Sequence, residues 1–339
     1  SRYIKQLEYH FGVPVNRYVV RYGKMSAATV LEIEKTEADV AKIKDTVLSA
    51  TTLQNYLACP AKFYFGTVKE LALEEEVAES LDYGTFGTVF HDTMRALYTS
   101  PSAMSPDFHF DHEGVNERNL TDRLDRIDRD YIRQWQDRKS DIKAKVDSLI
   151  VRQLNSMDVS GRNLVISDVI VRYVLKTLER DLEQLESECV DSFEVLGREI
   201  KVQGEFYGQK IKGFIDRLDS FHPEQARVVD YKTGKVLDDD EKIDDGNAEA
   251  IADKIFAPDV KERPKIALQF YIYDLLVRTR PEVQGRTVFN CIYSTSGLFK
   301  EAPVTYPCNE IFFNAVSDRL KGLLDEMYDT SVPFRRTGD

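Results

Sequence analysis

The sequence has few cysteines, and none of them has the spacing of a metal knuckle. The four cysteines of this 339-residue chain are Cys59, Cys189, Cys291 and Cys308, and no two form a Cys-x-x-Cys pair. This pattern argues against a disulfide framework and a zinc knuckle, and indicates reduced thiols in a cytoplasmic protein. The sequence also lacks an apolar run as long as a membrane span and a charged-then-apolar N-terminus typical of a signal peptide. We therefore expect no membrane partner.

An excess of positive charge is absent as well. The chain has 46 Lys and Arg against 58 Asp and Glu, a net charge of −12. A free-standing DNA-binding protein usually has a basic face and often a basic pI, so this balance argues against autonomous high-affinity DNA binding. Net charge does not set the sign of the potential inside a cleft, however. Hydrophobic residues at 42% and charged residues at 31% fit a globular protein with a sizeable core.

The apolar periodicity predicts a mixed α/β fold. We expect strands at 19–22, 193–203, 210–219, 226–231 and 286–294. We expect helices at 36–45, from Thr51 or Thr52 as N-cap to Phe63 with a break at Cys59-Pro60, and at 84–98, 123–138, 169–188, 264–278 and 309–328. An acidic loop is expected at 238–245. This order fits a small mixed sheet flanked by helices, with a helical insertion at about residues 100–190.

The domain organisation follows from the same pattern. We expect residues 1–50 to form an N-terminal linking segment with one strand and one helix, and residues 51–339 to form one domain. The first residue is Ser rather than Met. The chain is therefore expected to be a piece of a longer polypeptide.

Two acids and a lysine close neighbouring predicted strands. Asp216 ends the run Gly213-Phe214-Ile215-Asp216, and Asp230 and Lys232 end Val228-Val229-Asp230-Tyr231-Lys232. Because side chains alternate across a strand, Asp230 and Lys232 project from the same face. Two carboxylates can hold Mg²⁺ or Mn²⁺, and the lysine can orient or deprotonate water or stabilise charge on a phosphate. The pattern indicates metal-assisted phosphodiester hydrolysis. Strand ends followed by turns are the alternative explanation for the two aspartates.

A histidine on a glycine-lined helix is the next candidate. Gly84, Gly87 and His91 share one face of the predicted helix at 84–98. Glycines there leave room for another backbone or a substrate to approach, and the imidazole can reach a metal on the sheet. In isolation, a histidine on the helix flank that bonds a backbone carbonyl is the favoured explanation.

Three further polar residues are expected to support this site. Gln269 and Tyr273 are four residues apart on an apolar helix, so together they can bond a phosphate or brace the catalytic strand. Glu199 lies in the preceding strand and is a candidate extra ligand, although an exposed strand glutamate is the simpler interpretation.

Two other groupings suggest different chemistry. Lys232-Thr233-Gly234 and the Ser140–Lys143 spacing match two motifs of serine β-lactamases, but the third, Ser-Asp-Asn, is missing because Val169 follows Asp168. The group His109, Asp111, His112 and Glu113 lacks the helical spacing of metal ligands and is expected to be a solvated loop.

The motifs together resemble RecB/AddB-type nucleases of the PD-(D/E)XK superfamily. His91 in G-x-x-G-x-x-x-H, G-x-I-D-R-L-D at 213–219, V-V-D-Y-K-T-G-K at 228–235 and Q-x-x-x-Y at 269–273 occur in that family's order. The segment 52–65 is similar to the family's lead-in. The resemblance spans about residues 51–328 and implies a restriction-endonuclease-like fold.

The resemblance also implies roles. His91, Asp216 and Asp230 would hold Mg²⁺ or Mn²⁺ with the Tyr231 carbonyl, Lys232 would be catalytic, and Gln269 and Tyr273 would support the site or the DNA. Family members with an iron–sulfur cluster use one lead-in cysteine and three near the C-terminus. Here only Cys59 matches, so we expect no cluster and a packing role for Cys59.

The implied function is a DNA nuclease, expected to be an exonuclease, at the C-terminal end of a helicase–nuclease subunit in double-strand break repair. A helicase or nuclease partner subunit is expected, and the parent polypeptide would supply the basic surface that this chain lacks. The alternative is a catalytically silent module that binds DNA ends or a helicase partner.

Overall fold

The computed structural model describes residues 2–14, 32–71, 82–111, 115–258 and 260–337. The predicted strand at 19–22 lies outside these residues. The chain divides into two compact units, Ser1–Leu31 and Glu32–Asp339. The described part of the first unit contains helix α1 (Arg2–Tyr9), and every other element belongs to the second. None of the described helices combines the length and the apolar character that a membrane span requires.

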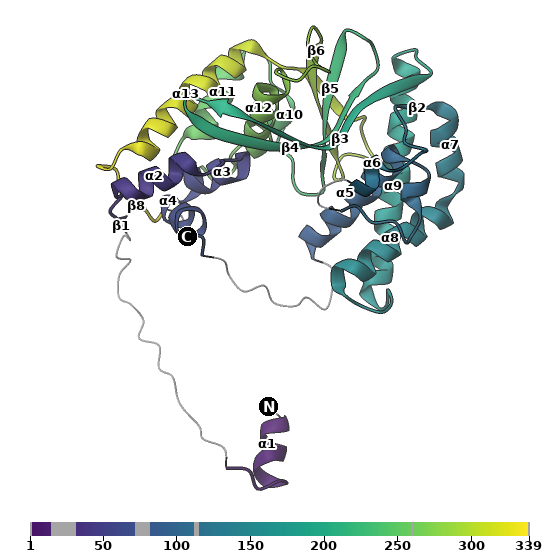
Figure 1. Ribbon diagram of the computed structural model, residues 1–339, viewed down its shortest axis with the longest axis horizontal. Coiled ribbons are helices and arrows are strands. Elements are labelled where there is room, and N and C mark those ends of the chain that lie inside the picture. Colours follow the sequence, from purple (N-terminus) through teal and green to yellow (C-terminus); the bar gives the residue numbers. More distant parts are fainter. Residues whose placement is uncertain (1, 15–31, 72–81, 112–114, 259, 338–339) are drawn as a thin grey trace. The chain divides into compact units, whose positions relative to one another are not determined.

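A six-stranded mixed sheet lies at the centre of the second unit (Figure 1). In spatial order its strands are β2 (Arg126–Asp128), β3 (Ser192–Phe206), β4 (Gln209–Ser220), β5 (Gln225–Lys232), β6 (Thr287–Ser294) and β7 (Val304–Pro307). Strands β5 and β6 are parallel, and the other neighbours are antiparallel. Strands β1 (Glu32–Ile33) and β8 (Phe334–Arg335) pair separately. The predicted mixed α/β fold is confirmed.

The β3–β4 hairpin has a two-residue turn that sets its register. Tyr207 and Gly208 both have positive φ angles, 52° and 77°, as a type I′ turn requires. Pairing then runs outward from Phe206 and Gln209 to Arg198 and Arg217. Positions on β4 near its far end are thereby matched to positions on β3.

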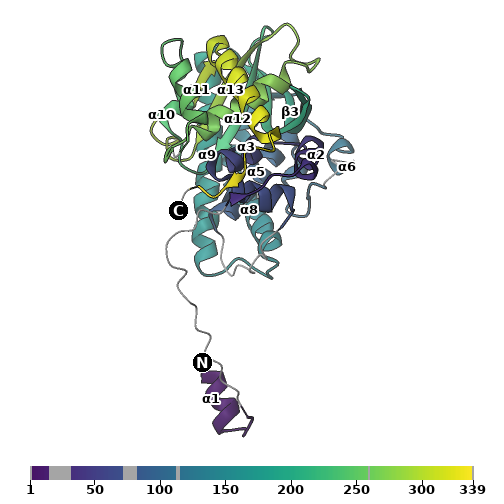
Figure 2. The ribbon, with the colours of Figure 1, turned by 90° about the vertical axis from the view of Figure 1, so that its left-hand side faces the viewer.

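Helices cover both faces of the sheet, and each face has its own apolar core. One core joins the strands to α2 (Glu37–Asp45), α3 (Ala50–Ala58), α4 (Pro60–Phe63), α11 (Ala248–Phe256), α12 (Lys265–Val277) and α13 (Glu310–Tyr328). The other joins them to α5 (Tyr83–Thr99), α7 (Arg129–Asp137), α8 (Lys139–Leu154) and α9 (Arg162–Ser187). Neighbouring residues of β5 alternate between the cores, Val228 in the first and Val229 in the second. Figure 2 turns the α11–α13 layer toward the viewer.

Two predictions of where a helix begins are wrong, and the predicted break at Cys59-Pro60 is confirmed. The N-cap of α3 is Ser49, not Thr51 or Thr52, because its hydroxyl accepts a hydrogen bond from the Thr52 amide at 3.2 Å. The predicted helix at 123–138 contains strand β2, since Ile127 is fully buried opposite Phe193, and helix α7 begins only after Asp128. The break at Cys59-Pro60 is a new helix start, with Pro60 as the first residue of α4.

The predicted acidic loop at 238–245 contains a short helix, α10 (Asp238–Glu241). Asp240 on this helix is buried, and its Oδ1 accepts hydrogen bonds from the Ile266 and Ala267 amides, both at 2.9 Å. Those amides open α12 and have no partner within the helix. The loop prediction is wrong for residues 238–241, where one of the acids caps a neighbouring helix, and it is confirmed for residues 242–245.

Candidate metal and active site

The site forms where strands β4 and β5 separate. Their last paired residues are Arg217 and Val229. Beyond this pair the Asp216 side chain replaces the backbone hydrogen bond between the strands, because its Oδ2 accepts a hydrogen bond from the Tyr231 amide at 2.7 Å. The two strand ends thus stay connected through a carboxylate whose other oxygen is available to further partners.

His91 reaches this point from helix α5. Its Nε2 lies 2.9 Å from the Tyr231 carbonyl oxygen, and its Nδ1 lies 3.3 Å from Asp216 Oδ1. One turn earlier, a Cβ atom on Gly87 would lie only 3.1 Å from Thr233 Oγ1. Gly87 therefore permits the close approach of α5 to the chain that follows β5. Gly84 has no such neighbour from another element.

Glu199 on β3 is the third member of the group. Arg198 pairs with Arg217 and Ile200 with Ile215, so Glu199 lies across from Asp216. Ligand atoms of His91, Glu199 and Asp216 all lie within 4.8 Å of one another, and all three residues are half-buried. The interpretation of Glu199 as an exposed strand glutamate is wrong, because the side chain faces this cluster.

Glu199 also has an unusual backbone. Its φ angle is +45°, a conformation that non-glycine residues rarely adopt and that often occurs at functional sites. A sequence signal for the residue did exist. Counting outward from a Tyr207-Gly208 turn places position 199 opposite Asp216, so recognising the turn identifies the acid.

The electrostatics of this group favour a cation. Burial, reinforced by the Asp216 charge, raises the pKa of Glu199 to about 8. Burial alone would lower the pKa of His91, but the hydrogen bond and charge of Asp216 and the charges of Asp230 and Glu199 raise it to about 9. The carboxylates therefore stabilise positive charge where the imidazole lies, which is the condition that a divalent cation needs.

Asp230 and Lys232 form a second part of the site, beside the first. Lys232 Nζ lies 2.6 Å from Asp230 Oδ2 and donates to Gln269 Oε1 at 2.7 Å. Gln269 Nε2 in turn donates to Asp230 Oδ1 at 3.1 Å. Asp230 and Lys232 do project from the same face of β5, as the strand alternation predicts.

Tyr273 braces this arrangement from α12. Its hydroxyl accepts a hydrogen bond from Gln269 Nε2 and donates one to the Phe214 carbonyl oxygen on β4. A Cβ atom on Gly213 would lie 2.8 Å from the Tyr273 ring, so glycine leaves the space that the ring fills. Of the two predicted roles for Gln269 and Tyr273, the contacts fit the bracing of the catalytic strand.

The residues present fit a hard divalent cation. One imidazole and two carboxylates suit Mn²⁺ and are compatible with Mg²⁺, which favours oxygen ligands. Among the residues that the structure describes, this is the one group of three such side chains. Glu199, predicted to support the site, belongs to this group. Asp230, predicted as a metal ligand, lies outside the group and bonds Gln269 and Lys232. The Tyr231 carbonyl oxygen, also predicted as a ligand, faces His91.

The residues of the rejected patterns have other partners. Lys143 lies 2.9 Å from Asp168 and bonds Ser167, and the exposed Ser140 bonds Asp141. Cys59 is half-buried at the junction of α3 and α4. The metal-like group at 109–113 lies partly outside the described residues.

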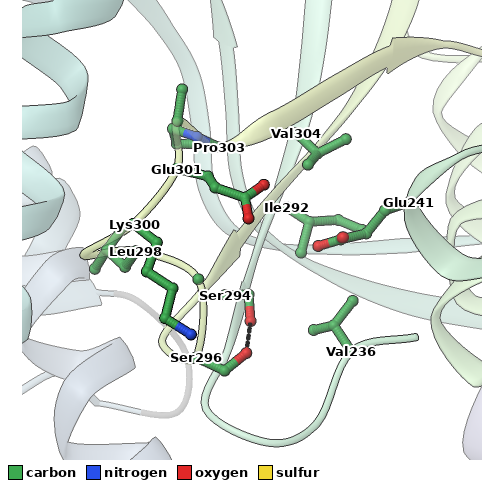
Figure 3. A pocket seen from close by; sticks show the side chains of 12 residues that line it. Val236, Glu241, Ile292, Ser294, Ser296, Leu298, Lys300, Glu301, Pro303 and Val304 are labelled. Carbon is green, nitrogen blue, oxygen red and sulfur yellow. Dashed lines mark hydrogen bonds between the residues drawn. The ribbon is translucent and has the colours of Figure 1, made fainter. Parts of the chain in front are cut away.

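A separate cavity lies between residues 292–304 and 236–241, with a volume of about 260 Å³ (Figure 3). Glu241, Lys300 and Glu301 are among the side chains that line it, and Ser294 and Ser296 hydrogen-bond at 2.7 Å beside it. None of the cluster residues lines this cavity. It therefore has no direct part in the chemistry of the cluster.

The family follows from this fold and this geometry taken with a sequence comparison. The model of the PD-(D/E)XK nuclease superfamily matches residues 47–339. The chain belongs to the PD-(D/E)XK nuclease superfamily. None of the curated proteins compared with the chain matches it. Membership confirms the predicted superfamily and the restriction-endonuclease-like fold, and it implies nuclease chemistry on DNA with a divalent metal such as Mg²⁺ or Mn²⁺.

Proposed function

We propose that this protein is a Mg²⁺- or Mn²⁺-dependent deoxyribonuclease that degrades DNA from its ends. The observation that carries the proposal is the contact between Lys232 and Asp230, held by Gln269 beside the His91, Glu199 and Asp216 group. A lysine paired to a buried acid next to a metal-ligand cluster can support metal-assisted phosphodiester hydrolysis.

In this mechanism His91, Glu199 and Asp216 would hold the cation, with Asp230 adjacent. The bound cation would stabilise the negative charge that develops on the scissile phosphate. Lys232 acts as a charged donor. Burial would lower the pKa of Lys232, but the charge and hydrogen bond of Asp230 raise it above its ordinary value. The ammonium therefore remains protonated and can bond a phosphate oxygen as charge builds there.

The biological setting is part of the same proposal. The ordered motifs at His91, 213–219, 228–235 and 269–273 support a RecB/AddB-type module of a helicase–nuclease subunit in double-strand break repair. In that role the module acts in the cytoplasm, with a helicase or nuclease partner subunit and without an iron–sulfur cluster.

Incubation of linear DNA with the protein and Mg²⁺ or Mn²⁺ tests the activity. We expect metal-dependent degradation by the wild type, blocked by EDTA and lost in Asp230→Asn. Asp318→Asn, on the exposed side of α13 and paired with Lys321 at 3.2 Å, is the matched control and should keep full activity. A wild type that binds DNA but never degrades it would contradict the proposal and favour the silent DNA-binding module.

A further inference from the structure

A large basic cavity adjoins the candidate site. Its volume is about 660 Å³, and residues of α5, α6 (Val115–Arg118), α8, β3 and β4 contribute to its wall. Figure 1 shows α5, α6 and α8 in the same helical layer beside the sheet. Six lining side chains are cations: Arg95, Arg118, Arg123, Arg152, Arg198 and Lys201. Such a concentration is notable in a chain with a net charge of −12.

Some of these cations already have partners in the fold. Arg95 Nη2 lies 2.6 Å from Glu117, and the buried Arg198 donates to backbone carbonyls on neighbouring segments. By contrast, the side chains of Arg123, Arg152 and Lys201 are exposed and have no hydrogen bond or ion pair with any residue that the structure describes. These three are therefore available to an anion.

The acids of the cavity do not cancel this charge. Glu117 is paired with Arg95, and Asp111 accepts hydrogen bonds from two backbone amides at the start of α6. Asp92 is the third acid of the lining. Glu199 belongs to the metal-ligand group. Six cations against these four acids leave a formal excess of two positive charges in the lining.

The cavity is connected to the site by two residues. Glu199 lines the cavity and also belongs to the metal-ligand group. Phe214, also in the wall, is 49% exposed and precedes Asp216 by two positions on β4, so both side chains project to the same face. An exposed aromatic ring beside a basic groove is the usual platform for an unpaired base.

We propose that this cavity binds backbone phosphates of a single DNA strand next to the scissile bond, and that Phe214 stacks on an adjoining base. The inference rests on the proposed nuclease function and adds a substrate class to it. Arg123, Arg152 and Lys201 bind the phosphates. Single-stranded DNA fits because its bases are free to stack on a protein ring.

Binding is tested without divalent metal, so that cleavage plays no part. Fluorescence anisotropy of a labelled single-stranded oligonucleotide is measured over a salt series for Arg123→Ala, Arg152→Ala, Lys201→Ala and the triple variant. Each single variant should bind about tenfold more weakly and reduce the salt slope by about 0.7. Arg133→Ala removes an exposed cation on α7, paired to Asp130 at 3.8 Å, and should bind like the wild type. Phe214→Ala should weaken binding about tenfold, and Phe214→Trp should restore it.

Three results would overturn the inference: wild-type affinity in the triple variant, an equal loss in Arg133→Ala, or a wild type that binds only duplex DNA. Thermal unfolding confirms that each variant is folded. In cleavage assays the cavity variants should raise KM more than they lower kcat. If the wild type binds as described but never cleaves, the nuclease function fails alone. If it cleaves and the triple variant binds normally, the cavity proposal fails alone.

Discussion

The imidazole of His91 connects a helix to the sheet through the backbone of Tyr231, with Nε2 2.9 Å from the carbonyl oxygen. The same ring lies 3.3 Å from Asp216 Oδ1, and Asp216 bonds the Tyr231 amide at 2.7 Å. One side chain thus joins α5 to both strands at the point where they separate. The geometry of the site therefore depends on the packing of α5 as well as on the strands themselves.

Replacing Lys232 should abolish most of the activity. Lys232→Met keeps the length of the side chain but removes the ammonium that pairs with Asp230 at 2.6 Å. We expect kcat to fall by about 100-fold to 1,000-fold, because a positioned charge is lost from the reacting phosphate. Steady-state cleavage of linear DNA with Mn²⁺ measures the change.

The matched control is Lys235→Met, three residues further along, where an exposed lysine pairs with Glu262. It should retain wild-type kcat. Full activity in Lys232→Met, with folding verified by circular dichroism, would show that the lysine has no role in catalysis.

Glu199→Gln should weaken metal binding. The carboxylate is one of three groups whose ligand atoms lie within 4.8 Å of one another. An amide of the same shape provides a weaker ligand without charge, so we expect Mn²⁺ affinity to fall by about tenfold or more. Titration calorimetry in the absence of DNA gives the dissociation constant directly. Glu205→Gln changes an exposed acid on the same strand and should leave it unaltered. Equal affinities for wild type and Glu199→Gln would remove Glu199 from the ligand set.

The sequence predicts the parts of this site that depend on local spacing. Asp230 and Lys232 share a face because a strand alternates, and Gln269 and Tyr273 meet because a helix repeats. The sequence places Glu199 in the correct strand but favours an exposed position for it. The strand pattern misses its burial because one of its neighbours, His91, lies on a helix about a hundred residues earlier, and because its positive φ breaks the pattern. Asp240 was placed in a loop for a similar reason, since its partners are the distant amides of Ile266 and Ala267. In both cases the residue contacts a segment that is distant in the sequence.

Gly213→Ala should disturb the site by displacing the ring of Tyr273. The added Cβ would lie 2.8 Å from two ring carbons of Tyr273 and 3.3 Å from Val202 Cγ2. The ring must move, which breaks its hydrogen bonds to Gln269 and to the Phe214 carbonyl. We expect unfolding free energy to fall by about 1–3 kcal/mol, as for other overpacked cores.

Urea unfolding measures the loss, and cleavage assays should show lower kcat in Gly213→Ala. The control is Gly322→Ala on α13, where an added Cβ meets nothing within 4 Å. That change should raise the unfolding free energy by about 0.5–1 kcal/mol, because alanine favours a helix over glycine. An unperturbed Gly213→Ala variant would mean that the Tyr273 ring has more room than the contact implies.

Asp274 should make stability depend on pH. It is buried on α12, and burial raises its pKa to about 6, although the Asn290 hydrogen bond at 3.0 Å opposes the shift. A carboxyl with a raised folded-state pKa favours folding while it is protonated, and that contribution is lost as pH rises from about 4 through 6. Asp274→Asn cannot ionise, so its stability relative to wild type should increase over this range, by on the order of 3 kcal/mol. Urea unfolding of wild type and Asp274→Asn from pH 4 to pH 7.5 measures the difference in unfolding free energy. For Asp318→Asn, which replaces an exposed carboxyl, the difference from wild type should vary far less over this range. A constant difference between Asp274→Asn and wild type across these pH values would show that folding does not shift the pKa of Asp274.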